Sequence, residues 1–149
     1  MKPEETIDYH LKSTWLRIVK MYNSIASEYQ ATQGIGMLLI NIDEEGTFVT
    51  DLGPRSGIEK TSLARIMKSM EDQGLIVRIP DTLDRRKVLV KLTEEGAKKR
   101  KIARKVVRSF NELILSKLNK SEKDTFFKVM EKINQSIEEF KKQTNEKKN

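Results

Sequence analysis

The chain has 149 residues, of which 34% are charged and 37% hydrophobic, and its formal net charge is +7. This length suffices for one domain with a buried core, and the composition is typical of a soluble, helix-rich protein. The excess of Lys and Arg favours a polyanionic partner such as nucleic acid. Because the chain has no cysteine, disulfides, thiolate metal sites and regulation by thiol oxidation are excluded.

The sequence carries no signal for a membrane, a metal or catalysis. No apolar run approaches the roughly 20 residues that span a bilayer, and the N-terminus does not resemble a signal peptide, so we expect a cytoplasmic protein. His10 is the only histidine and has no ligand cluster beside it, so no metal or other cofactor is expected. Without a phosphate loop, a nucleophile elbow or a nucleophile–base pair, an enzyme is not expected.

The first predicted element is a long amphipathic helix from Thr6 to Tyr29. Its large apolar residues recur with the period of one helix face, at Ile7, Leu11, Trp15, Ile18, Tyr22, Ile25 and Tyr29. The apolar run 37–42 then predicts a fully buried second helix. Residues 47–49 are long enough only for an edge strand.

Two short helices are predicted next. Thr50 is expected to cap the first, with Asp51 in its first turn and Gly57 at its end. The second covers 59–73, and its predicted buried face consists of Leu63, Ile66, Met67 and Met70.

The opposite face of this second helix is polar and basic, and we predict that it enters the major groove of DNA. Arg65 is suited to a bidentate contact with guanine, and Lys68 to a phosphate. On an arbitrary sequence the same residues would be an ordinary solvated face, but their place between a glycine turn and a basic loop favours DNA. The predicted contacts are Lys60, Thr61, Ser62, Arg65, Lys68 and Ser69.

A β-hairpin is predicted after Gly74. Its first strand covers 75–79 and ends at Pro80, and the return strand 87–92 alternates apolar and polar residues. The connection is short and strongly charged. We interpret it as a wing that contacts DNA through Asp84, Arg85, Arg86 and Lys87.

Two long helices are predicted to complete the chain. Thr93 is expected to cap the first, which covers 94–118, and Ser121 marks the start of the second. Together with the first helix they carry more apolar surface than a lone winged domain can bury, so we predict that they form the interface of a homodimer. The Lys-rich end, 142–149, is predicted to be a flexible basic tail.

The order and spacing of these motifs resemble the MarR family of bacterial transcriptional regulators. The segment from Leu52 to Ile76 is similar to that family's helix-turn-helix, and Asp84-Arg85-Arg86 followed by Leu92-Thr93-Glu94-Glu95-Gly96 resembles its D-x-R and L-T-x-x-G signatures. The sequence departs from the family pattern at Glu59 and at Gly53-Pro54. The resemblance implies a mostly α fold with a small β wing, in which Asp84 braces an arginine and Arg86 reaches the minor groove.

By the same resemblance the whole chain is one MarR-type domain. Residues 32–96 would form the winged helix-turn-helix lobe, and 6–30 with 97–141 the helical dimerisation region. Such dimers bind pseudo-palindromic operators, usually as repressors, and commonly release DNA when a small aromatic or amphipathic effector binds between the two regions. Candidate pocket residues here are Trp15, Tyr22 and Met37, although residues at such positions more often pack a core or a dimer interface.

The sequence therefore predicts a sequence-specific, double-stranded-DNA-binding regulator, a homodimeric repressor released by an effector. Two alternatives use the same winged fold: a protein that binds nucleic acid without sequence preference, and a module that binds another protein.

Overall fold

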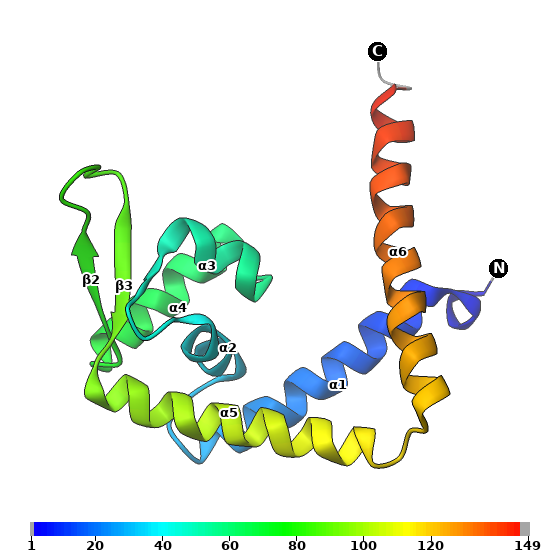
Figure 1. The fold of residues 1–149 in the computed structure, drawn as a ribbon, viewed down its shortest axis with the longest axis horizontal. Coiled ribbons are helices and arrows are strands. Elements are labelled where there is room, and N and C mark those ends of the chain that lie inside the picture. The colour runs from blue at the N-terminus through cyan, green and yellow to red at the C-terminus, as the bar shows by residue number, and fades with distance from the viewer. Residues whose placement is uncertain (1, 147–149) are drawn as a thin grey trace. The chain divides into compact units, whose positions relative to one another are not determined.

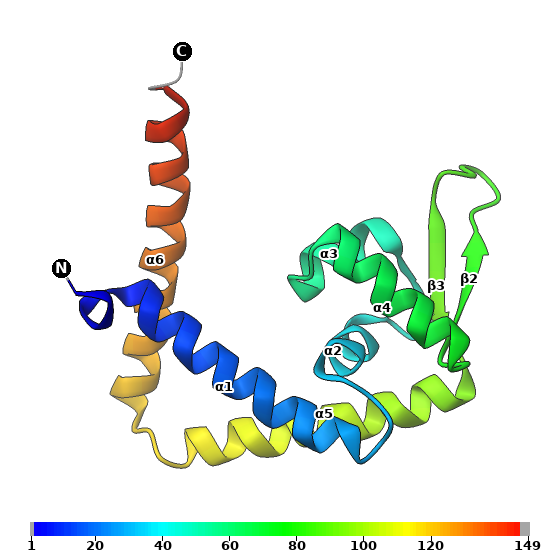
Figure 2. The ribbon, with the colours of Figure 1, turned by 180° about the vertical axis from the view of Figure 1, so that it is seen from behind.

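The computed structural model describes residues 2–146, and Figures 1 and 2 show its helices and its wing. After a short 3₁₀ turn at Pro3–Glu5 the elements are α1 (Ile7–Ser27), α2 (Gln33–Asn41), β1 (Thr47–Phe48), α3 (Val49–Ser56), α4 (Lys60–Asp72), β2 (Ile76–Pro80), β3 (Val88–Leu92), α5 (Glu94–Leu115) and α6 (Lys120–Glu146). The chain divides into two compact units within α5, one ending at Val106 and the other beginning at Val107. The predicted fold class, mostly α with a small β wing, is confirmed.

The three strands form an antiparallel sheet in the order β1-β3-β2. β2 and β3 make the predicted hairpin, with Ile76 opposite Leu92 at its base and Pro80 opposite Val88 near its tip. β1 pairs with the other side of β3, where Thr47 lies opposite Val90. β1 is therefore the edge strand that the sequence predicted.

The hydrophobic core of the first unit is centred on α2, which contacts α1, α3 and α4. The core consists of Ile35, Leu38, Leu39, Ile42, Leu52, Leu63, Met67, Met70, Leu75, Ile76 and Val90. The prediction of a fully buried second helix was wrong in part, because Met37 and Ile40 are only half-buried. The helix also begins earlier than the apolar run, since the Thr32 hydroxyl accepts a hydrogen bond from the Ile35 amide and caps it.

The two faces of α4 are those that the sequence predicted. Leu63, Met67 and Met70 are buried, and Ile66 packs half-buried against the core. On the opposite face Thr61, Arg65, Lys68 and Asp72 are exposed. The hydrophobic residues therefore decide which side of α4 is available to a partner.

Several helix ends differ from the prediction. α3 begins at Val49, and the residue before it, Phe48, makes no side-chain cap, so Thr50 lies inside the helix and is not its N-cap. α6 is capped by Asn119 rather than by Ser121: the Asn119 Oδ1 accepts from the Glu122 amide at 2.9 Å, and the Glu122 carboxylate accepts from the Asn119 amide at 2.8 Å.

The extents of the last two helices also differ from the prediction. α5 ends at Leu115, short of the predicted Leu118. α6 continues to Glu146, so the predicted flexible tail is helical over 142–146, and 147–149 lie outside the described residues.

The start of α5 is joined to the end of α4 by the Thr93-Glu94-Glu95-Gly96 segment. As predicted, Thr93 caps α5, because its hydroxyl accepts from the Gly96 amide at 3.1 Å. The same hydroxyl donates to the Gly74 carbonyl at 2.6 Å, and the Thr93 amide donates to the Leu75 carbonyl at 3.0 Å. Gly96 lies so close to Leu75 that a Cβ there would overlap the Leu75 carbonyl oxygen. A residue without a side chain is therefore required at this junction.

Replacing Gly96 with alanine should lower the free energy of unfolding by about 1 to 3 kcal/mol, because the backbone at Leu75 must move to admit the methyl group. Gly36→Ala in α2 is the matched control: its Cβ would lie 3.9 Å from the Ala103 Cβ, an ordinary contact. The control should gain up to about 1 kcal/mol from helix propensity. Urea denaturation followed by circular dichroism measures both, and equal stability of the two variants would contradict the steric explanation.

Among the described residues, no helix is both long and apolar enough to cross a membrane.

Candidate nucleic-acid interface

The exposed face of α4 brings most of the predicted recognition residues together. Lys60, Thr61, Arg65 and Lys68 are exposed, whereas Ser62 and Ser69 at its margins are half-buried. The Lys68 ammonium lies 3.3 Å from the Asp72 carboxylate, a weak surface pair that a phosphate could displace. The Ser69 hydroxyl accepts a hydrogen bond from the Gln73 side-chain amide at 3.1 Å.

The N-terminus of α4 begins after Glu59, which occupies the cap position without making a side-chain cap bond. The backbone amides of the first helical turn therefore keep no carboxylate or hydroxyl partner from that residue. Such a helix start attracts anions through its free amides and its dipole. This end of α4 combines those amides with the Lys60 side chain.

The tip of the wing is shaped by its acidic residues. The Asp84 carboxylate accepts a hydrogen bond from the Arg86 amide at 3.0 Å and lies 3.5 Å from the Arg86 Nε. The Asp84 amide in turn donates to the Asp81 carboxylate at 3.3 Å. The Arg86 side chain nevertheless remains 94% exposed. Asp84 thus orders the turn while the guanidinium projects from it, which is the relation that the family resemblance implied.

The other two cations of the wing, Arg85 and Lys87, differ in their contacts with the rest of the protein. Arg85 is exposed at the tip. The Lys87 ammonium lies 5.8 Å from the centre of the Phe48 ring on β1, within the range of a cation–π interaction. Lys87 is therefore held at the base of the loop, and Arg85 and Arg86 are the wing cations that stand furthest from the paired strands.

Sequence reasoning missed the ion pairs that join these elements to one another. The Arg78 guanidinium on β2 lies 3.0 Å from the Glu71 carboxylate on α4, so the wing and α4 share a salt bridge. Alternation along β2 places Arg78 on one face of the strand but does not identify its partner. Only the fold brings these two residues together.

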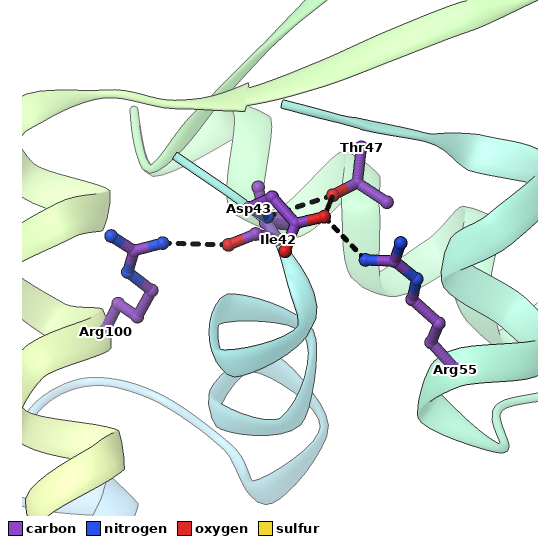
Figure 3. A network of polar contacts seen from close by, with 5 residues as sticks. All are labelled: Ile42, Asp43, Thr47, Arg55 and Arg100. Atoms are coloured by element: carbon purple, nitrogen blue, oxygen red, sulfur yellow. Dashed lines mark hydrogen bonds and ion pairs between the residues drawn. The ribbon is translucent and has the colours of Figure 1, made fainter. Parts of the chain in front are cut away.

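A second polar network connects the turn after α2 to α3 (Figure 3). The Arg55 Nη1 donates to the Asp43 Oδ2 at 2.6 Å, and the Thr47 hydroxyl lies 3.3 Å from the same oxygen. Thr47 itself is buried, and its hydroxyl accepts from the Asp43 amide at 2.9 Å. The Arg55 guanidinium holds the pKa of the Asp43 carboxyl below its usual value, so this pair is charged at neutral pH.

The three predicted effector-pocket residues lie on α1 and α2, which contact each other. Trp15 on α1 is 48% exposed, whereas Tyr22 on α1 and Met37 on α2 are half-buried. Burial raises the pKa of the Tyr22 hydroxyl. A shared pocket for these residues stays a prediction.

Comparison with known proteins decides the family. The MarR family model matches residues 36–88, the stretch from α2 to the start of β3. The chain is 30% identical over 107 residues to the HTH-type transcriptional regulator SarZ of Staphylococcus aureus, a stretch covering 70% of this chain and 72% of SarZ. The chain belongs to the MarR family. The matched region of this MarR chain contains α4 and both arginines of the wing tip.

Other relatives of this MarR chain carry the names of transcriptional regulators as well. It is 31% identical over 99 residues to the organic hydroperoxide resistance transcriptional regulator of Bacillus subtilis, covering 65% of this chain and 67% of the relative. With an HTH-type transcriptional regulator of Mycobacterium bovis it shares 36% identity over 73 residues, 49% of this chain. The chain spans about half the length of that mycobacterial relative, 51%.

Solved structures show the same fold as this MarR chain. The S. aureus MepR–DNA complex superposes with a TM-score of 0.80 at 17% identity, covering 88% of this chain and 98% of MepR. The PcaV regulator of Streptomyces coelicolor, in complex with its natural ligand, gives a TM-score of 0.76 at 19% identity and covers 92% and 97% of the two chains. The winged helix-turn-helix fold expected from the sequence is thereby confirmed.

Proposed function

We propose that this MarR-family chain is a sequence-specific DNA-binding transcriptional regulator that acts as a homodimeric repressor. The observation that carries the proposal is the exposed cationic surface of α4 and the wing, where Arg65, Lys68 and Arg86 project from elements fixed by the core. α4 enters the major groove, and the wing reaches the adjacent minor groove or backbone. Lys60, Thr61, Ser62 and Ser69 contribute contacts at the margins of α4.

The proposed contacts fall into two groups, those that distinguish DNA bases and those that bind the DNA backbone. Arg65 presents a planar fork of donors that matches the O6 and N7 acceptors of guanine, so it supplies base discrimination. Lys68, Arg85 and Arg86 supply contacts to phosphate, which position the protein on any duplex. Asp84 acts through Arg86, because it fixes the turn from which that arginine projects.

A homodimer accounts for the apolar surface that each unit exposes. On α1 Ile7, Trp15 and Leu16 are largely exposed, and on α6 so are Phe126, Phe127 and Phe140. Large exposed apolar patches are rare on monomeric proteins and often mark an interaction surface. Residues 6–30 and 97–141 therefore form the dimerisation region, and 32–96 the DNA-binding lobe. Two copies of α4 would read half-sites about one helical turn, roughly 34 to 36 Å, apart on a pseudo-palindromic operator.

Release from DNA requires an effector that distinguishes two states of the dimer. A small aromatic or amphipathic molecule near Trp15, Tyr22 and Met37 dissociates the complex only if it binds the free dimer more tightly than the DNA-bound dimer.

Although one relative is named for organic hydroperoxide resistance, this chain has no cysteine. A cysteine-based response to an oxidant is therefore excluded here.

Fluorescence anisotropy with the DNA upstream of the gene, a scrambled duplex and a salt series tests the proposed function. A regulator should prefer its site by about 10³ or more, and log affinity should fall steeply with log salt. Equal affinity for every upstream and scrambled duplex would indicate non-specific binding. Negligible affinity at physiological salt would favour a protein partner for the winged lobe.

Alanine substitutions on α4 should separate base reading from phosphate binding. Arg65→Ala should cost about 1 to 3 kcal/mol on the operator and relax discrimination at one position of each half-site. Lys68→Ala should weaken binding to all duplexes alike and reduce the slope against log salt by about 1. Anisotropy on a set of single-base operator variants measures both effects. If Arg65→Ala keeps the parent's ranking of those variants, Arg65 does not read a base.

A further inference from the structure

Polar contacts connect the first part of α5 to the winged lobe. Within the described chain, none of the residues of the hydrophobic core lies on α5, and the only buried residues of this helix are Gly96 and Arg100. Since Gly96 has no side chain, Arg100 is the one side chain that α5 buries over its described length. That side chain is 8% exposed, although it stands in a run of cations whose neighbours Lys98 and Lys101 are exposed.

Arg100 reaches from α5 to the C-terminal end of α2 (Figure 3). Its Nη1 donates to the Ile42 carbonyl at 2.9 Å, and its Nη2 lies 3.2 Å from the Glu44 carboxylate. A cation at this position is favourable, because the C-terminal end of a helix carries partial negative charge. The guanidinium therefore holds the two residues on either side of Asp43.

Asp43 continues the connection to α3. Its carboxylate binds Arg55 in the last turn of α3, and its amide is fixed by the Thr47 hydroxyl at the start of β1. The contacts of Arg100 with the Ile42 carbonyl and Glu44, and the contact of Asp43 with Arg55, are thus joined by the backbone of residues 42–44. Together they link α5 to α3, and we call them the α5–α3 relay. Every contact in the relay lies within the first compact unit.

We propose that Arg100 is a positioning residue: through the α5–α3 relay it fixes the helix-turn-helix relative to α5 and so sets the discrimination between operator and other DNA. α3 packs through Leu52 into the same core as Leu63 of α4, so a shift of α3 changes the presentation of the recognition face. The part concerning DNA rests on the proposed function. The mechanical part, that Arg100 holds α3 in place, does not depend on DNA.

A hydrogen-bonded clamp suits this role better than apolar packing would. Two bonds from one planar guanidinium define a direction as well as a distance. Apolar contacts are non-directional, and none of the core residues lies on the described part of α5. Any movement of α5 must therefore either carry the turn after α2 with it or break the bonds of Arg100.

Arg100→Met and Asp43→Asn test the two ends of the relay, with Lys101→Met as the matched control. Met keeps most of the volume of the arginine without its hydrogen bonds, and the control removes one exposed cation from the next position of the same helix. Asp43→Asn removes the charge at a side chain that is 61% exposed, so this variant should fold even if Arg100→Met does not. Hydrogen exchange of the free protein and anisotropy with operator and scrambled duplexes are measured for all variants.

Both relay variants should speed amide exchange in α3, and the preference for operator over scrambled DNA should fall about fivefold or more. Binding to the scrambled duplex should stay close to that of the parent, because no relay residue is proposed to touch phosphate. Combining Arg100→Met with Asp43→Asn should add little to the larger single effect, since both interrupt the same connection between α5 and α3.

Three results would overturn the proposal: exchange in α3 like that of Lys101→Met, equal decreases in affinity for both duplexes, or fully additive effects in the double variant. If the parent itself shows no preference for any duplex, the proposed function fails. The exchange of α3 amides then decides by itself whether Arg100 holds that helix. Should Arg100→Met unfold, the exchange and discrimination of Asp43→Asn give the same decision from the other end of the relay.

Discussion

Replacing Leu38 with alanine is expected to lower the free energy of unfolding by about 2 to 5 kcal/mol. Leu38 lies on α2, is fully buried with an exposed fraction of 0%, and belongs to the core that joins α2 to α3 and α4. The truncation removes apolar contacts and leaves a cavity that a close-packed interior fills only in part. Since domains are stable by only about 5 to 15 kcal/mol, this single change should remove a large fraction of the total.

The wing offers a chemically identical control. Leu83 at its tip is 95% exposed, so Leu83→Ala removes the same atoms without creating a cavity and should leave stability unchanged within about 0.5 kcal/mol. Urea denaturation at neutral pH compares the two variants directly. Equal stabilities would show that the core around α2 repacks freely, and the account of how α4 is positioned would then fail.

Hydrophobic periodicity predicted the parts of this fold that apolar residues determine. The spacing of Leu63, Met67 and Met70 defined the buried side of α4 and, by exclusion, the exposed face that carries Arg65 and Lys68. Alternation along the second hairpin strand predicted β3, in which Val90 is buried. These predictions held because each depends on which side of a helix or strand is apolar, a property that is local in the sequence.

Helix ends were predicted less well, because several residues compete to cap them. Thr50 was the expected cap of α3, yet the helix extends back to Val49 because β1 ends directly before it. Ser121 and Asn119 are both good capping residues, and only Asn119 has a glutamate at the position that completes a reciprocal pair. Propensity ranks the candidates, whereas the packing of neighbouring elements selects among them.

The polar contacts between distant elements could not be predicted at all. Arg100 stands among lysines and arginines that face solvent, and periodicity treats every charged residue as a surface residue. Its burial follows from the Ile42 carbonyl and the Glu44 carboxylate, which are brought to α5 by the fold. The same holds for Arg55 with Asp43 and for the ion pair between β2 and α4. A sequence identifies the charged groups, but their partners depend on the three-dimensional arrangement.

The wing is expected to supply much of the affinity for DNA of any sequence. Replacing both Arg85 and Arg86 with alanine should weaken binding to operator and scrambled duplexes alike, by about a hundredfold or more in the dimer, because a hydrogen bond to a charged group contributes roughly 1.5 to 3 kcal/mol. The slope of log affinity against log salt should decrease by about 0.9 for each phosphate that the protein no longer neutralises.

Lys101→Ala with Lys105→Ala on the exposed side of α5 removes the same net charge and serves as the control. If long-range attraction by the net charge alone produced the affinity, the control and the wing variant would show equal decreases in affinity. Their slopes of log affinity against log salt would also be the same. A decrease confined to the wing variant instead requires direct contacts, which the 94% exposure of Arg86 permits.

Because Asp84 fixes the turn from which Arg86 projects, Asp84→Asn should reproduce part of that decrease although it makes the protein more positive. An increase in affinity for Asp84→Asn would mean that net charge, and not the geometry of the wing, governs binding.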